Sequence, residues 1–179
     1  SFPGTEGSPL SSAALGSLPT DRAHRYALPM TNDQTPRASL HPELSAHPIQ
    51  LNIPVSFGDM DAYGHVNNTR YFRWFEDVRF AAFTIAKMQE VQERTGLGPI
   101  LARTSCVFKA PVTYPDTIFA GVRVTDIGED RFTMEHRLVS ETQGIVVAEG
   151  DARIVVIDYR RGGKAPLPAE VRVVLEGMR

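Results

Sequence analysis

A long stretch without glycine or proline constrains the fold of this chain more than any other feature. No helix breaker occurs in residues 69–95, where Tyr71, Phe75 and Val78 begin a stripe at helical spacing. Further apolar side chains widen the stripe until it covers most of the circumference. A helix of this kind must be enclosed by other elements, because water would otherwise meet its apolar surface. Gly96 marks its predicted end.

Strand patterns flank this predicted helix on both sides. Residues 51–57 alternate between apolar and polar side chains, and Pro54 indicates an edge strand or a bulge, since proline cannot donate to a neighbouring strand. After the helix the chain alternates repeatedly, with Gly150 as a predicted bulge. The predicted later strands are 100–109, 118–124, 132–138 and 145–157, followed by a short helix over 168–175.

These elements predict an α+β fold in which one antiparallel sheet wraps around the long helix. The last four strands are expected to follow one another as a meander. Five strands leave part of the helix and one sheet edge uncovered. That uncovered surface favours a second copy of the chain, so a homodimer or homotetramer is expected.

Composition limits the remaining possibilities. Residues 1–47 are rich in Ser, Pro, Thr, Ala and Gly without periodicity, which predicts a flexible extension before a domain at 48–179. The 19 basic and 21 acidic residues include no basic block with interleaved aromatics, so no nucleic-acid partner is expected. No apolar run is long enough for a membrane span. Cys106 is the single cysteine, so an internal disulfide and a zinc site with cysteine spacing are excluded. This fits a cytoplasmic protein. Cys106 itself is expected to be a buried apolar residue.

Chemically versatile side chains crowd the junction between the first strand and the helix. The segment 57–71 contains Asp59, Asp61, a glycine, a histidine and two asparagines. A helix start presents unpaired backbone N–H groups and the positive end of the helix dipole. A carboxylate and backbone donors that face one point can hydrolyse an ester or a thioester.

The same segment resembles the signature of the 4-hydroxybenzoyl-CoA thioesterase-like branch of the hotdog superfamily. From Asp59 to Tyr71 it matches the pattern D-x-D-x-x-G-H-V-N-N-x-x-Y, and Glu76 and Arg79 match an acid and an arginine on the following helix. The stretch 108–117 resembles the F-x-x-P-x-x-x-x-D turn of that family. The resemblance extends over about residues 49 to 160 and implies a hotdog fold.

The resemblance also implies roles for individual residues. Asp61 would act as the general base on water or as the nucleophile on the thioester carbonyl. Backbone N–H groups at Gly64, His65 and Val66 would polarise that carbonyl, and the His65 side chain is a further candidate for acid chemistry or for substrate orientation. Asp59 is expected to organise the turn by accepting backbone hydrogen bonds.

Four residues at the start of the helix complete the candidate site. One of Asn67 and Asn68 is expected to cap the helix, while the other orients Asp61 or the nucleophilic water, and Asn68 is also a candidate for substrate binding. Tyr71 and Phe75 are expected in the core, with the possibility of lining an acyl chamber. His136 alternates with apolar residues and is expected to be a core or interface histidine with its hydrogen bonds satisfied. No metal site and no cofactor are predicted.

The sequence therefore predicts an acyl-CoA thioesterase. Acyl carrier protein esters are the nearest alternative, but plant-type acyl-ACP thioesterases normally carry an asparagine where this chain has Tyr63. A hotdog dehydratase is disfavoured because its catalytic pair is not evident. A non-catalytic acyl-CoA-binding module is the alternative from a different functional class.

Overall fold

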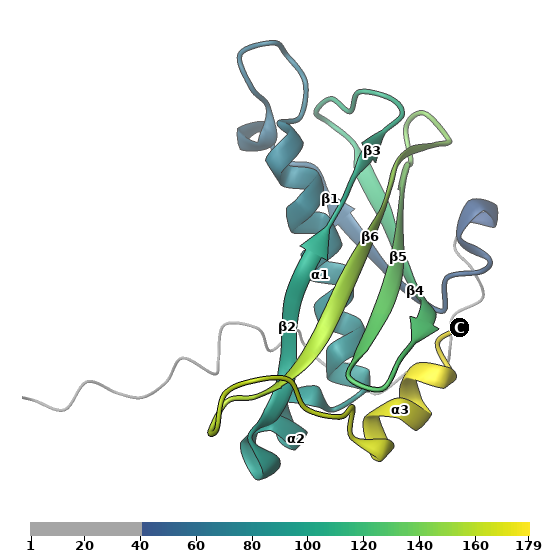
Figure 1. Ribbon diagram of the computed structural model, residues 1–179. Coiled ribbons are helices and arrows are strands. Elements are labelled where there is room, and N and C mark those ends of the chain that lie inside the picture. The colour runs from purple at the N-terminus through teal and green to yellow at the C-terminus, as the bar shows by residue number, and fades with distance from the viewer. Residues whose placement is uncertain (1–40) are drawn as a thin grey trace, which may run out of the picture. The chain divides into compact units, whose positions relative to one another are not determined.

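A curled antiparallel sheet dominates residues 41–179, which are the residues that the computed structural model describes (Figure 1). Its strands are β1 (Ile49–Pro54), β2 (Leu97–Thr104), β3 (Val107–Phe108), β4 (Thr117–Ile127), β5 (Arg131–Ser140) and β6 (Ile145–Asp158). They lie in the order β1-β4-β5-β6-β2, and β3 also pairs with β6. The predicted α+β class, with one antiparallel sheet around a helix, is confirmed.

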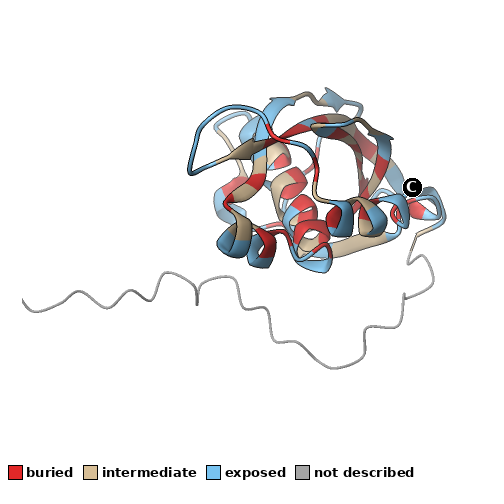
Figure 2. Cartoon of the chain, turned by 60° about the horizontal axis from the view of Figure 1, so that its bottom comes forward, coloured by how far each residue is buried: buried red, intermediate tan, exposed pale blue. Residues whose placement is uncertain are grey.

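The helix α1 (Asn68–Ile85) packs on the concave face of this sheet. Its Trp74, Phe75 and Val78 are at most 2% exposed, and Ile118 and Val122 of β4 are fully buried. Figure 2 shows the buried residues gathered where the helices and the sheet face each other. The wide apolar surface of α1 is therefore enclosed, as the sequence predicts.

The single helix expected over 69–95 is wrong, because the chain forms two helices. α1 ends before Ala86, Lys87 adopts a left-handed conformation with φ 51°, and α2 (Met88–Thr95) follows. This turn redirects the chain so that Met88 and Val91 are buried, beside β2 and the end of β6. A lysine is no helix breaker, so the sequence gives no local sign of the turn. The closing helix α3 (Ala169–Glu176) lies where it is predicted.

The predicted order of strands needs correction as well. Only β4, β5 and β6 form a meander, whereas β2 pairs with β6 at the opposite side of the sheet from β4. The segment 109–116 carries the chain from one side to the other. Alternation reports which face of a strand is buried but not which strand lies beside it, so this order could not be read from the pattern.

The strand expected over 100–109 is interrupted by Ser105 and Cys106, which separate β2 from β3. Cys106 is half-buried and packs against the core, and burial raises the pKa of its thiol to about 11. Gly150, predicted as a bulge, instead pairs in register with His136. A Cβ at Gly150 would lie 2.1 Å from the carbonyl oxygen of Ser105, so a glycine is required there by close backbone approach.

The folded body starts earlier than residue 48. A short 3-10 turn over Pro42–Leu44 packs on the outer face of the sheet, and Leu44 and His47 are at most 1% exposed. Gly121 makes room for both of these side chains. Residues 41–47 are therefore part of the body, and residues 1–40 of the predicted extension lie outside the described part of the chain.

β1 and β2 form the two edges of the sheet, and Pro54 lies on an edge strand as predicted. The other edge carries apolar side chains that are 42% to 62% exposed, namely Ile100, Leu101, Val107 and Phe108. Within residues 41–179 no helix combines the length and the apolar character that crossing a membrane requires.

Candidate active site

The loop between β1 and α1 is fastened at its base by Asp59. This carboxylate is 4% exposed, and its Oδ2 accepts a hydrogen bond from the Ser56 N–H at 2.9 Å. Its Oδ1 forms an ion pair with Arg70 in the first turn of α1, at 2.5 Å. The prediction that Asp59 organises the turn through backbone hydrogen bonds is confirmed. The sequence does not predict the ion pair with Arg70, because spacing alone does not show which side chains meet across the loop.

The tip of the loop is a tight turn that presents Asp61. Met60 and Val66 form an antiparallel bridge, and the Gly64 N–H donates to the Asp61 carbonyl at 3.1 Å. Gly64 has φ +76°, a conformation that favours glycine. The Tyr63 N–H donates to Asp61 Oδ1 at 2.9 Å. Within residues 41–179 the second carboxylate oxygen of Asp61 has no hydrogen-bond donor, so it is available to a water molecule or a substrate.

Two of the three predicted carbonyl-polarising donors are engaged within the chain. The Val66 N–H donates to the Val112 carbonyl at 2.8 Å, and the Gly64 N–H closes the Asp61 turn. In the described part of the chain, the His65 N–H has no acceptor. The N–H groups of Ala62 and of Asn68, the first residue of α1, likewise have no acceptor in residues 41–179.

The start of α1 is capped by Asn67. Its side-chain oxygen accepts hydrogen bonds from the Thr69 N–H at 3.0 Å and from the Thr69 hydroxyl at 2.7 Å. Asn68 is exposed at the first position of the helix. Capping by one of the two asparagines is confirmed for Asn67, and within residues 41–179 the Asn68 side chain has no hydrogen-bond partner.

Tyr71 and Phe75 belong to the core. Tyr71 is 3% exposed, and its ring lies 5.1 Å from the rings of both Trp74 and Phe108. Phe75 is fully buried, and its ring lies 4.9 Å from the ring of His136. Both residues thus belong to the core, and neither lines the hollow beside Phe80 and Lys87 or the small one beside Met88.

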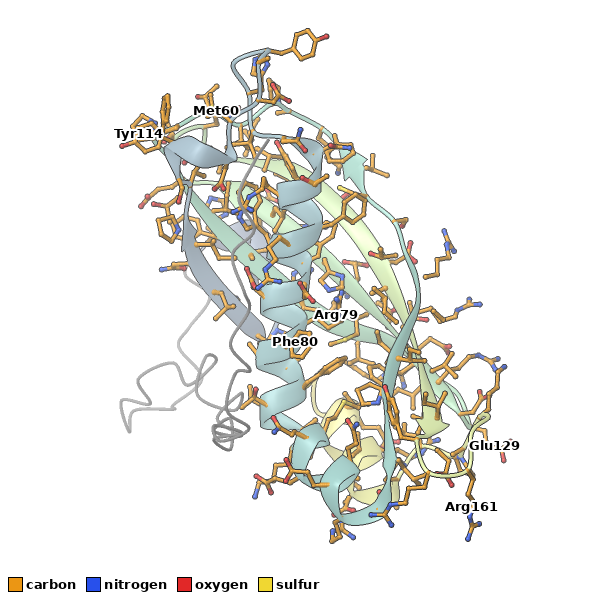
Figure 3. All side chains as sticks on the ribbon, turned by 90° about the vertical axis from the view of Figure 1, so that its left-hand side faces the viewer. Met60, Arg79, Phe80, Tyr114, Glu129 and Arg161 are labelled. Carbon is orange, nitrogen blue, oxygen red and sulfur yellow. The ribbon has the colours of Figure 1, made fainter. Side chains whose placement is uncertain are left out.

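The segment 109–116 forms the other side of the loop. The ring of Tyr114 stands edge-on to Phe57 at 5.8 Å, and the Tyr114 N–H donates to the Met60 sulfur at 3.3 Å. Figure 3 shows Met60 and Tyr114 together at this end of the molecule. The Val112 carbonyl, which holds Val66, belongs to the same segment. The turn that resembles F-x-x-P-x-x-x-x-D therefore supports the loop that carries Asp61.

Asp116 anchors this supporting segment. Its carboxylate accepts hydrogen bonds from the Ser140 hydroxyl at 2.5 Å and from the N–H groups of Thr117 and Thr142 at 2.7 and 3.0 Å. Partial burial opposes ionisation, but these hydrogen bonds outweigh it and lower the pKa of Asp116. The side chain is therefore a fixed anion at neutral pH.

Asp116→Asn should lower the stability of the fold near neutral pH, and the loss should disappear in acid. A lowered pKa means that the folded state prefers ionised Asp116, so this contribution is present above the ordinary pKa of 3.8 and is lost as the pH falls through the folded-state pKa. Urea midpoints of the two proteins at about pH 7 and about pH 2.5 measure the difference. Asp126→Asn, on an exposed carboxylate of β4, is the control. A difference that stays constant across this pH range would contradict the assignment.

A hollow of the described residues lies at the opposite end of α1 from Asp61. Its volume is about 860 Å³, and its walls include Phe80, Phe83, Lys87 and Tyr159. Arg160 also lines it and donates to the carbonyls of Glu93 and Arg94 at the end of α2. Within one copy of the chain this hollow and the Asp61 loop are therefore separate features.

Comparison with known proteins places this geometry in a family. The model of the thioesterase-like superfamily matches residues 55–175, which include the loop, α1 and all strands except β1. The PA2801 protein from Pseudomonas aeruginosa is 30% identical, with a TM-score of 0.63 over 71% of this chain and 97% of that chain. A thioesterase from Thermus thermophilus, solved in complex with coenzyme A and zinc, is 27% identical, with a TM-score of 0.65 over 74% of this chain and 95% of that one.

A curated relative agrees with this placement. The long-chain acyl-CoA thioesterase FadM of Escherichia coli is 22% identical over 130 residues, which are 73% of this chain and 98% of that protein. In residues 41–179 no three His, Cys, Asp or Glu side chains are grouped to hold a metal ion. The chain belongs to the thioesterase-like superfamily and is a thioester hydrolase of the hotdog fold.

Proposed function

We propose that this protein hydrolyses acyl-CoA thioesters and that Asp61 carries the reaction. The observation that supports this most is the setting of the Asp61 carboxylate. One of its oxygens is fixed by the Tyr63 N–H, while the other has no donor within residues 41–179. It lies in the same short loop as the free His65 N–H, next to the start of α1. The coenzyme A bound to the Thermus thermophilus relative supports coenzyme A as the thiol carrier.

The proposed chemistry follows from these groups. The N–H groups of His65 and Asn68 donate to the thioester oxygen, which becomes more negative as the tetrahedral intermediate forms. Asp61 takes a proton from a water molecule while the water oxygen bonds to the carbonyl carbon. The carbon–sulfur bond then breaks, and the sulfur leaves as a thiolate that regains a proton. In the alternative role, Asp61 bonds to the carbonyl carbon itself, and water hydrolyses the resulting anhydride.

A second copy of the chain is part of this proposal. The β2 edge presents unpaired backbone groups beside the exposed side chains of Ile100, Leu101 and Phe108. Phe80 on the neighbouring flank of α1 is 54% exposed. Two copies that bury these edges against each other would cover apolar surface of the kind that single chains rarely expose. We therefore expect a homodimer or a pair of homodimers, and a cytoplasmic location without a cofactor remains the expectation from sequence.

Release of free thiol from a panel of thioesters tests the function. We expect turnover with acyl-CoA esters, and much weaker turnover when the same acyl groups are carried by acyl carrier protein. The panel should contain short, long and aromatic acyl groups, because acyl preference depends on a pocket that the motif does not define. Faster turnover of the acyl carrier protein esters would mean that acyl carrier protein, and not coenzyme A, is the thiol carrier of the substrate. Binding of acyl-CoA without turnover by the intact protein would contradict hydrolysis and favour a binding module.

A further inference from the structure

The segment 41–47, here called the N-terminal clasp, lies on the outer face of the sheet, on the side away from α1 (Figure 1). Its Leu44 and His47 side chains are at most 1% exposed. Both rest on the backbone of β4, because a Cβ at Gly121 would lie 2.8 Å from Leu44 Cδ2 and 2.9 Å from His47 Cβ. The clasp is therefore anchored by one apolar side chain and one titratable side chain.

Side chains, and not backbone pairing, join the clasp to the sheet. Its N–H groups at Leu44 and His47 donate to carbonyls within the clasp, at 2.9 and 2.8 Å, and within residues 41–179 no backbone hydrogen bond connects it to a strand. The Gln50 side chain of β1 donates to the carbonyls of Leu44 and His47 at 3.0 and 2.9 Å. The ladder between β1 and β4 begins only at Ile49. The clasp can therefore leave the outer face while β1 stays paired.

Charged side chains of β4 and β5 surround the buried ring of His47. Arg137 lies directly opposite Gly121, and Arg123, two residues further along β4, shares the same face. The Nε2 of His47 lies 3.5 Å from Glu135 Oε1, and neither ring nitrogen has a well-formed hydrogen bond among the described residues. Arg123 already binds both oxygens of Glu135, at 3.2 and 3.0 Å. The carboxylate beside the ring is therefore neutralised by another cation.

The other charged groups around the clasp are paired as well. Arg137 donates to the Glu43 carbonyl at 2.9 Å and forms ion pairs with the carboxylates of Glu43 and Glu149, the latter of which also pairs with Lys109. On the opposite face of β5, His136 is fully buried, and within residues 41–179 its ring nitrogens have no well-formed hydrogen bond. The expectation that this histidine is satisfied is wrong. Burial lowers the pKa of His136 to about 3, so it is neutral at physiological pH.

This setting disfavours a proton on the docked clasp. Burial lowers the pKa of His47 below its ordinary value of 6.5, the charge of Arg137 acts in the same direction, and Glu135 opposes the shift without cancelling it. A released clasp exposes the ring to water, where its pKa is ordinary. A proton therefore binds the released form in preference. Docking has its full strength well above pH 6.5 and weakens as the pH falls from there toward the lowered pKa.

We propose that the N-terminal clasp is a pH-sensitive device, in which protonation of His47 in mildly acidic solution releases residues 41–47 from the outer face while the sheet stays folded. Release uncovers the backbone of β4 at Gly121 and detaches the segment that precedes β1. The clasp lies over β4 and β5, whereas the edge expected to meet a second copy is β2, on the far side of β6. Pairing of two copies at that edge therefore leaves the device in place.

Hydrogen exchange of the clasp measures its release. The N–H groups of Leu44 and His47 exchange when the clasp opens, so their protection factors, corrected for the intrinsic effect of pH on exchange, report the opening. Between about pH 7.5 and about pH 5.0 we expect this protection to fall severalfold, up to a limit of about thirtyfold that follows from the ordinary pKa of 6.5. Amides of the central strand β5 should keep their protection. No fall in the clasp, or an equal fall in β5, would overturn the proposal.

Substitutions test whether His47 carries the proton. His47→Phe and the smaller His47→Leu cannot be charged, so the protection of Leu44 should no longer depend on pH in either variant. Arg123→Gln frees Glu135 to pair with protonated His47, so the loss of protection at about pH 5.0 should shrink about threefold or more. Arg153→Gln, on an exposed arginine of β6, should lose protection as the wild type does. If neither apolar side chain fits over β4, Arg123→Gln decides. A loss that persists in both His47 variants, or that is unchanged in Arg123→Gln, would overturn the proposal.

Discussion

Asp61→Asn should lower kcat for thioester hydrolysis about a hundred- to ten-thousand-fold. The amide neither takes a proton from water nor attacks a thioester, so the loss is expected for both roles of Asp61. The loop should keep its shape, because the asparagine oxygen can still accept the Tyr63 N–H that Asp61 Oδ1 accepts at 2.9 Å. Thiol release under saturating substrate measures the loss, and a thermal melt verifies that the fold is intact.

Asp126→Asn makes the same chemical change on an exposed carboxylate of β4 and should leave kcat unchanged. The pair separates the effect of Asp61 from the effect of removing one negative charge. Retention of more than about a tenth of the activity in Asp61→Asn would mean that another group activates the water. A different carboxylate would then have to act beside the N–H groups of His65 and Asn68. Asp59 is unsuited to this role, because Arg70 and the Ser56 N–H already bind its two oxygens.

Side-chain periodicity predicts the helices and strands of the fold, but it does not predict which strands lie beside each other. Alternation along β4 predicts that Ile118 and Val122 face inward, and both are fully buried. The same rule cannot tell that β2 lies beside β6 instead of β4, because either arrangement buries the same side chains. The sequence does not predict the break after α1 for a similar reason. Lys87 adopts its left-handed conformation to direct Met88 and Val91 into the core, a tertiary effect without a local sequence sign.

The candidate site divides in the same way. The motif places Asp59, Asp61 and Asn67 in one loop, and local spacing is enough to predict the capping role of Asn67. Local spacing does not reveal that Val112, far along the chain, accepts the Val66 N–H. That long-range hydrogen bond removes a predicted donor from the site. Local hydrogen bonds in the site can thus be predicted from the sequence, whereas hydrogen bonds to distant segments such as Val112 cannot.

Gly150→Ala should destabilise the protein by about 3 kcal/mol, at the upper end of what overpacking costs. The new Cβ would lie 2.1 Å from the Ser105 carbonyl oxygen and 2.7 Å from the Phe75 ring. The oxygen cannot withdraw easily, since the Ser105 N–H donates to the Asp151 carbonyl at 2.9 Å and its side chain also bonds the Asp151 carboxylate. We expect the Tm to fall by roughly 10 °C, measured by calorimetry.

Gly58→Ala is the matched control, because a Cβ at Gly58 meets nothing within 4 Å. Its stability should stay within about 0.5 kcal/mol of the wild type. An equally small effect of Gly150→Ala would show that the junction between β2 and β3 can move away from β6. The Phe75 ring, which lies against His136, would then also have room to move away from β6. A large loss at Gly150 alone instead means that the junction between β2 and β3 and the Phe75 ring are both held closely against β6.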